Sequence, residues 1–169
     1  MPSIQEDMNY LRGQLRTGSI QKAYRALLGY MMNLRTHFKN IYPNHSISGI
    51  YQGCMDMTYF AIIPPPLKQR DLKAAIVFNY EAFRFEIWLA GRNRQVQRKY
   101  WELFRDSRWT AYRLVAPAKG VDSILEYGLA EDFDFGGLDR LTACIEEKAG
   151  QFIGDVERFL AEHETQSRG

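Results

Sequence analysis

Apolar residues recur with helical spacing near both ends of the chain. Close to the N-terminus, Ser3 and Glu6 have the spacing of a capping box, in which each side chain hydrogen-bonds to the backbone of the other residue. The apolar residues that follow are four, three and four positions apart, as one face of a helix requires: Ile4, Met8, Leu11 and Leu15. Near the C-terminus, steps of three and four from Leu138 to Phe159 predict a long amphipathic helix.

A second helix is predicted from about Ser19 to Asn40, after Gly18 ends the first one. Its apolar residues recur every seven positions: Ile20, Leu27, Leu34 and Ile41. A seven-residue repeat is typical of coiled coils, but three repeats beside a short first helix favour a helical hairpin within one chain. Homodimerisation through an exposed part of this stripe is an open alternative.

The middle of the chain has the short apolar runs and turn residues of β-strands. The clearest pair is a hairpin of residues 74–80 and 83–90, joined at Glu81-Ala82. The prolines at 64–66 cannot take part in a strand ladder, and they predict a stiff connecting loop of polyproline II type. Further strands are predicted at 46–51, 55–63, 109–116 and 123–129, and a basic helix at 93–106.

These elements predict an α+β domain. Strands joined by short turns favour an antiparallel or mixed central sheet, here of four to six strands. The expected helices around it are the N-terminal helical hairpin, the basic middle helix and the long C-terminal helix. A chain of 169 residues has the length of one domain, so residues 1–169 are predicted to form a single domain with a frayed polar tail from about His163.

Composition narrows the class of protein. Cys54 and Cys144 are the only cysteines, and their separation fits neither a disulfide framework nor a metal site, which favours a reducing compartment. We expect no signal peptide, and no run approaches the roughly 20 apolar residues of a membrane span. The three histidines have no metal-binding or catalytic spacing, so no metal and no cofactor is expected. The prediction is a cytoplasmic protein without a membrane partner.

The charge is unevenly distributed, although its net value is only +2. Residues 1–120 carry 18 Lys and Arg against 8 Asp and Glu, whereas residues 121–169 carry 4 against 12. This asymmetry suits a surface that binds nucleic acid. It also suits an acidic C-terminal helix that packs near the basic half and cancels its field, which is the more ordinary arrangement.

One side of the predicted strand 83–90 has the composition of a small-ligand site. Alternation separates an apolar set (Phe83, Phe85, Ile87 and Leu89) from a second set of Arg84, Glu86 and Trp88. Asp56 and Thr58 alternate on an earlier strand and are expected to join the second set, which would line a polar pocket with an aromatic wall. The alternative is an ion-pair network of Arg84, Glu86 and Asp56 beneath a helix, with Trp88 packed at its edge.

The start of the basic helix predicts an anion site. Helix N-termini present unpaired N–H groups and a partial positive charge, and Arg92 and Arg94 lie there although positive charge is unfavourable at that end. Phosphate or a nucleic-acid backbone is the natural partner, with aromatic side chains to stack on bases: Trp101, Trp109 and Tyr112. The alternative is that Asn93 caps the helix and the arginines belong to a solvated face.

From about Ile20 to Leu160 the chain resembles an uncharacterised family of small bacterial proteins, a domain of unknown function. The similar segments are GIYQGCMDMTYF (Gly49–Phe60), IVFNYEAFRFEIWLAG (Ile76–Gly91), QRKYWELF (Gln97–Phe104) and ILEYGLAEDFDF (Ile124–Phe135). The resemblance implies a single-domain bacterial protein, and it implies no particular activity or cofactor.

The order of predicted elements is also similar to the core of the restriction-endonuclease superfamily, which places an Asp on its second core strand and a Glu/Asp-x-Lys on its third. On this likeness Glu86 takes the acidic position of the third strand. However, Trp88 stands at the position of the Lys, and Asn79 stands on the strand where the Asp is expected. Metal-dependent nucleases need such groups, so the likeness implies a catalytically decayed relative.

The sequence therefore predicts a non-enzymatic binding or interaction module with an anion- or phosphate-binding surface. Its partner would be a small anionic ligand or another protein. The alternative is a nucleic-acid-binding protein or a decayed relative of the endonucleases. The predicted ligand-binding residues are Asp56, Arg84, Glu86, Trp88, Arg92 and Arg94.

Overall fold

The computed structural model describes residues 1–166 of the chain. Its internal contacts form two compact units, residues 1–34 and the residues from Arg35 onward. Helix α1 (Ile4–Arg16) lies in the first unit, and helix α2 (Ser19–Ile41) begins in the first and ends in the second.

The first helix begins as the sequence predicts, but its apolar face is not packed. The capping box is confirmed, because the Ser3 hydroxyl accepts a hydrogen bond from the Glu6 amide at 3.3 Å and the Glu6 carboxylate accepts one from the Ser3 amide. No residue of α1 is buried, and its apolar stripe is exposed at Ile4, Met8, Leu11 and Leu15. Two N-terminal helices are therefore present, but α1 does not form the packed arm of a hairpin.

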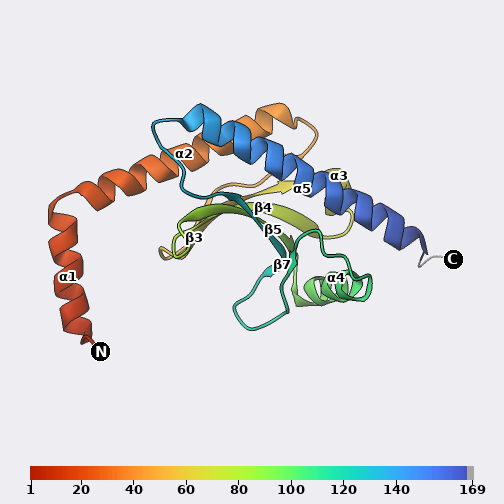
Figure 1. Ribbon diagram of the computed structural model, residues 1–169, viewed down its shortest axis with the longest axis horizontal. Coiled ribbons are helices and arrows are strands. Elements are labelled where there is room, and N and C mark those ends of the chain that lie inside the picture. Colours follow the sequence, from red (N-terminus) through yellow and green to blue (C-terminus); the bar gives the residue numbers. More distant parts are fainter. Residues whose placement is uncertain (167–169) are drawn as a thin grey trace. The chain divides into compact units, whose positions relative to one another are not determined.

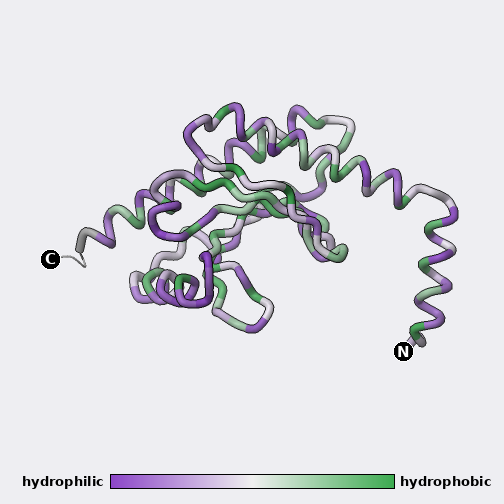
Figure 2. The backbone as a smooth tube through the Cα atoms, turned by 180° about the vertical axis from the view of Figure 1, so that it is seen from behind, coloured by the Kyte–Doolittle hydropathy of each residue, from purple (hydrophilic) through white to green (hydrophobic). Residues whose placement is uncertain are grey.

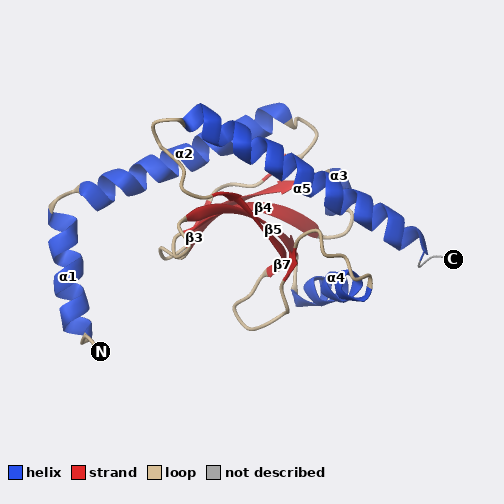
Figure 3. Ribbon diagram, in the orientation of Figure 1, coloured by secondary structure: helices blue, strands red, loops and turns tan. Residues whose placement is uncertain are grey.

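Within the described residues, the second unit contains a seven-stranded antiparallel sheet in the order β1-β3-β4-β5-β7-β6, with β2 paired to β3. The strands are β1 (Ser46–Ile47), β2 (Tyr51–Gln52), β3 (Met57–Ile63), β4 (Leu72–Asn79), β5 (Arg84–Gly91), β6 (Arg113–Leu114) and β7 (Ser123–Ala130). The accompanying helices are α3 (Pro65–Lys68), α4 (Arg94–Asp106) and α5 (Leu138–Gln166) (Figure 1, Figure 3). The α+β class and the antiparallel sheet are confirmed. The two-residue strands β1, β2 and β6 raise the strand number above the predicted four to six.

Three predicted segments differ from the structure. The predicted strand 46–51 is divided into β1 and β2, and residues 48–50 between them form no strand. The chain starts the short helix α3 at Pro65 instead of forming an extended loop, because a proline at the first helical position gives up no intrahelical hydrogen bond. The predicted strand 109–116 shrinks to the two residues of β6. Its first residue, Trp109, instead stacks on Phe159 of α5, with the ring centroids 4.8 Å apart.

Helix α5 lies along one face of the sheet and covers the main core of this unit (Figure 1). The central strands turn apolar and fully buried side chains to this α5 face: Phe60, Ile76, Phe78, Phe85, Ile87 and Leu89. Phe152 and Val156 of α5 are buried to the same degree. Hydrophobic positions are accordingly concentrated on the strands (Figure 2), and their burial is the main stabilising contribution. The opposite face of β3, β4 and β5 is called the pocket face below.

A glycine allows β5 to pass directly into α4. A Cβ atom at Gly91 would lie 2.9 Å from the amide nitrogen of Gln97, which is too close for a larger residue without a shift of the helix. Asn93 then caps α4, since its side chain accepts a hydrogen bond from the Val96 amide at 2.9 Å. The N-cap interpretation of Asn93 is therefore confirmed, and the start of α4 is fixed at the edge of the pocket face.

The C-terminal helix is longer than predicted. It continues to Gln166, so the first residues of the predicted frayed tail are helical, and residues 167–169 lie outside the described residues. Glu164 accepts hydrogen bonds from Arg70 at 2.7 Å and from the Tyr100 hydroxyl at 3.0 Å. Burial and the hydrogen bond to Glu164 raise the pKa of Tyr100. These contacts hold the end of α5 against α4 and the α3–β4 connection.

Candidate functional site

The predicted alternation is confirmed in β5. Arg84, Glu86 and Trp88 lie together on the pocket face, and the apolar residues between them lie on the α5 face. In β4, Ala75 lies opposite Trp88 and Val77 lies opposite Glu86, so these residues share that face. Alternation allows β4 to turn either Ala75 and Val77 or Ala74 and Ile76 to this face, and the structure has the first pair there.

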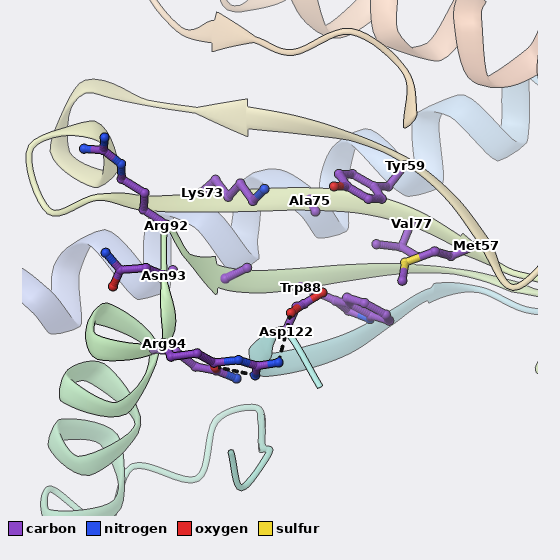
Figure 4. Close-up of a pocket in the computed structure, with 13 residues that line it drawn as sticks. Met57, Tyr59, Lys73, Ala75, Val77, Trp88, Arg92, Asn93, Arg94 and Asp122 are labelled. Atoms are coloured by element: carbon purple, nitrogen blue, oxygen red, sulfur yellow. Dashed lines mark hydrogen bonds and ion pairs between the residues drawn. The ribbon is translucent and has the colours of Figure 1, made fainter. Parts of the chain in front are cut away.

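A cavity of about 430 Å³ lies on the pocket face, over β3, β4 and β5 (Figure 4). We call it the sheet pocket. Ala75 and Val77 form its floor, and the rings of Tyr59 and Trp88 stand beside them. The face is hollow here because a short alanine side chain lies among these larger residues. Its volume falls within the range of roughly 300–1,000 Å³ that is typical of small-molecule sites.

The rim of the sheet pocket is charged. Its exposed and half-buried charged and amide side chains are Lys73, Arg92, Asn93, Arg94 and Asp122 (Figure 4), and the buried amide of Gln97 also lines the cavity. The rim side chains come from β4, from the β5–α4 junction and from the loop before β7, three segments that are well separated in the sequence. Of the predicted ligand-binding residues, the structure brings Trp88, Arg92 and Arg94 to this one pocket.

Arg94 is held by other parts of the chain. Its Nη1 donates to the Gln97 side chain at 2.9 Å, to the Ala118 carbonyl at 3.3 Å and to the Val121 carbonyl. Its Nη2 lies 3.7 Å from the Asp122 carboxylate. These contacts fix the loop before β7 against α4, which gives a structural reason for a positive charge at this helix start.

The other two cations of the rim, Arg92 and Lys73, form weaker interactions with the rest of the chain. The Arg92 side chain is 76 % exposed, and its Nη1 lies 3.7 Å from the Asp71 carboxylate, beyond ordinary hydrogen-bond length. Lys73 lies over the ring of Tyr59, with Nζ 5.5 Å from the ring centroid, and it forms no ion pair with any residue that the structure describes. Burial raises the pKa of Tyr59, with smaller contributions from Tyr51 and Asp122.

A buried carboxylate positions Trp88. Glu86 is 2 % exposed, and its two oxygens accept hydrogen bonds from Arg84 Nε at 2.7 Å and from Trp88 Nε1 at 2.8 Å. Arg84 also donates to Glu131 at 2.7 Å, and the hydrogen bonds to Glu86 and Glu131 raise the pKa of Arg84. The Arg84–Glu86 ion pair of the alternative interpretation is therefore present. Arg84 and Glu86 line a neighbouring cavity of about 380 Å³ with Tyr112, and not the sheet pocket itself.

Asp56 and Thr58 do not join this group. Asp56 lies in the exposed turn before β3, where its carboxylate accepts a hydrogen bond from the Met57 amide at 2.8 Å. Thr58 is fully buried on the α5 face, opposite Phe78, and bonds to the Tyr80 hydroxyl at 2.8 Å. The expectation that Thr58 shares the face of Glu86 is wrong, because the pairing register of β3 with β4 turns it to the other side.

Two residues of the pocket rim, Lys73 and Asp122, were not predicted from the sequence. Lys73 precedes Ala75 by two positions in β4, so alternation places it on the pocket face, but the predicted strand began only at Ala74. Extending that strand by one residue would have found it. Asp122 reaches the pocket through a loop that Arg94 and Gln97 hold in place, and no local pattern predicts such a long-range contact.

Two further properties concern the chain as far as it is described. Over this part, no three His, Cys, Asp or Glu side chains converge in a way that could hold a metal ion. Over the same residues, every helix is too short or too polar to cross a membrane.

The fold and the pocket define an α+β protein with an antiparallel sheet and one hollowed sheet face. A family model described as a domain of unknown function, DUF7000, matches residues 4–160, and the chain therefore belongs to this family. The resemblance to an uncharacterised domain family is thus confirmed. No curated protein and no solved structure matches the chain, and the likeness to restriction endonucleases has no support.

Proposed function

We propose that this protein is a non-enzymatic binding module whose sheet pocket holds a small anionic ligand, with a phosphate or carboxylate group at Lys73 and Arg92. The observation that carries the proposal is a pair of cations, neither bonded closely to a carboxylate, at the rim of a cavity of about 430 Å³. A hydrogen bond to a charged group contributes about 1.5–3 kcal/mol, so two such contacts support specific binding of an anion.

The distribution of charge around the rim favours this end of the pocket for the anion. At the other side the Arg94 guanidinium already donates to Gln97 and to two backbone carbonyls of the loop before β7, so it has fewer free donors for an anion than Arg92. Asn93 uses its side-chain oxygen as the helix cap, which leaves its NH₂ group as a donor beside Arg92. Two cations and one amide donor suit the several acceptor oxygens of a phosphate.

Titration calorimetry with inorganic phosphate tests the proposal. In the double variant Lys73→Ala/Arg92→Ala we expect affinity to fall at least about tenfold, because two charged donors are lost. The matched control is Arg98→Ala/Lys99→Ala, which removes two exposed cations of α4 that do not line the pocket. Equal losses in both variants would point to general charge attraction, and absence of phosphate binding in the wild type would refute the proposal. Arg94 is left unchanged, since its removal would release the loop before β7.

The remaining alternatives are not favoured by a specific observation. Stacking of bases on Trp101 is disfavoured, because the Arg105 guanidinium already lies over its ring at 4.7 Å from the centroid. Nucleic-acid binding by α4 stays a prediction from the charge pattern, as do a protein partner and homodimerisation through α2. A cytoplasmic location in a bacterium likewise stays a prediction.

A further inference from the structure

The sheet pocket is polarised along its length. Arg92 and Asn93 lie at one end, at the β5–α4 junction, whereas Met57, Val77 and Trp88 lie toward the other end (Figure 4). The proposed anion site extends from Arg92 to the Lys73 ammonium, which lies over Tyr59, and leaves the part beside Met57, Val77 and Trp88 to another part of the ligand (Figure 4).

At the second end the Tyr59 hydroxyl is a side-chain hydrogen-bonding group, and the other side chains there are apolar or already bonded (Figure 4). The only polar atom of the Trp88 side chain, Nε1, already donates to buried Glu86 at 2.8 Å. Ala75 and Val77 have no polar side-chain atom, and the thioether of Met57 is only a weak acceptor. A polar group placed against Trp88, away from the Tyr59 hydroxyl, would give up its water without gaining a partner, which is unfavourable. This end therefore suits an apolar group.

The size of the cavity also requires more than a bare anion. A water molecule occupies about 30 Å³ in the liquid. Phosphate has five heavy atoms, so if each took up as much room as a water molecule, the ion would fill at most roughly 150 Å³. The sheet pocket measures about 430 Å³. A phosphate at Lys73 and Arg92 would thus leave most of the pocket unfilled.

The aromatic wall is held in place before any ligand arrives. Glu86 fixes the indole of Trp88, and Arg84 fixes Glu86 through the bond of 2.7 Å. A rigid ring gives a large contact area at little cost in conformational entropy, which favours binding of an apolar body against it.

From these features we infer that the ligand is an amphipathic anion. Its acidic group binds at Lys73 and Arg92, and an apolar body about the size of one ring lies against Trp88. This inference rests on the proposed function, because it places the ligand in the same pocket and accepts the same anion site.

Calorimetry with three probes tests the inference: inorganic phosphate, phenyl phosphate and phenol. We expect phenyl phosphate to bind about tenfold or more tightly than inorganic phosphate, because its ring buries apolar surface. Trp88→Leu should remove this advantage and leave the affinity for inorganic phosphate within about twofold. The control Trp101→Leu, which alters a tryptophan outside the pocket, should retain the advantage.

A measurement on the wild-type protein tests the same contact even if the Trp88 variant folds poorly. The chain has three tryptophans, so the ¹H–¹⁵N spectrum contains three indole signals, which single Trp→Phe variants assign. Phenyl phosphate should shift the Trp88 signal and leave those of Trp101 and Trp109 in place.

The possible failures are distinguishable. Equal affinities for phosphate and phenyl phosphate, both dependent on Arg92, would overturn this inference and leave the proposed function standing. Phenol that binds at Trp88 as tightly as phenyl phosphate would overturn both, since the charge would then contribute nothing. A wild-type protein that binds neither phosphate compound would likewise remove both.

Discussion

The two faces of the sheet use the same strands for different purposes. On the α5 face, the central side chains are large, apolar and fully buried, and α5 completes their packing. On the pocket face, the same strands carry alanines, a buried carboxylate and a ring of charged rim residues. Ala74 and Ala75 are neighbours in β4 with the same side chain, yet one lies in the core and the other on the pocket floor. The role of a position in the sheet therefore depends on what packs against its face, and not on the type of side chain alone.

The largest effect is expected from the α5 face. Phe152→Ala removes a fully buried ring that packs on Tyr112 and Tyr127, and should lower the free energy of unfolding by about 3–5 kcal/mol. Urea denaturation followed by circular dichroism measures this loss. A loss below about 1 kcal/mol would mean that α5 contributes little to the core, and the contrast between the faces would disappear.

The adjacent alanines give a matched comparison. Ala74→Leu inserts a larger side chain into a fully packed position and should destabilise the protein by about 1–3 kcal/mol. Ala75→Leu should cost less than about 1 kcal/mol, because the side chain can extend into the sheet pocket, and it should abolish phosphate or phenyl phosphate binding there. Thermal denaturation of both variants measures the two stability losses, and calorimetry measures their binding of phosphate and phenyl phosphate. If the two costs are equal, the cavity over Ala75 does not exist in solution.

The smallest effect is expected at the buried carboxylate. Glu86→Gln keeps the shape of the side chain, but its one amide oxygen can accept from only one of Arg84 and Trp88, and its NH₂ group then faces the other donor. The expected cost is about 1 kcal/mol, at the low end for a lost hydrogen bond because both donors are partly exposed. The near-ultraviolet circular dichroism of the indole should also change. Glu131→Gln is the control, since its side chain is 61 % exposed and its pair with Arg84 should contribute less than about 0.5 kcal/mol. Similar losses in both variants would show that Glu86 has no special role in positioning Trp88.

Local periodicity predicted much of this structure, and the failures have physical causes. The alternation in β5 placed Arg84, Glu86 and Trp88 on one face, because side-chain direction in a strand follows from backbone geometry alone. The register between β3 and β4 depends on pairing with a second strand, so Thr58 could not be placed from its own segment. The apolar spacing of α1 predicted a helix correctly, but spacing does not reveal whether that stripe finds a partner.

The same limit applies to the pocket. Arg92 and Arg94 are adjacent to one helix start and look equivalent in the sequence. They differ only in the folded protein, where carbonyl groups of the loop before β7 accept hydrogen bonds from Arg94. The Arg92 guanidinium has no such bonds to the loop, and its side chain stays exposed.

The close approach at Gly91 has a consequence for how this architecture can diversify. A single methyl group at that position would press on the first turn of α4, and the loop tied to that turn through Arg94 and Gln97 would have to travel with it. The entrance of the cavity would then shift as one piece while the alanine and valine beneath it kept their places. If the proposed function holds, a change at Gly91 would alter the charged rim of the sheet pocket and leave its apolar floor unchanged.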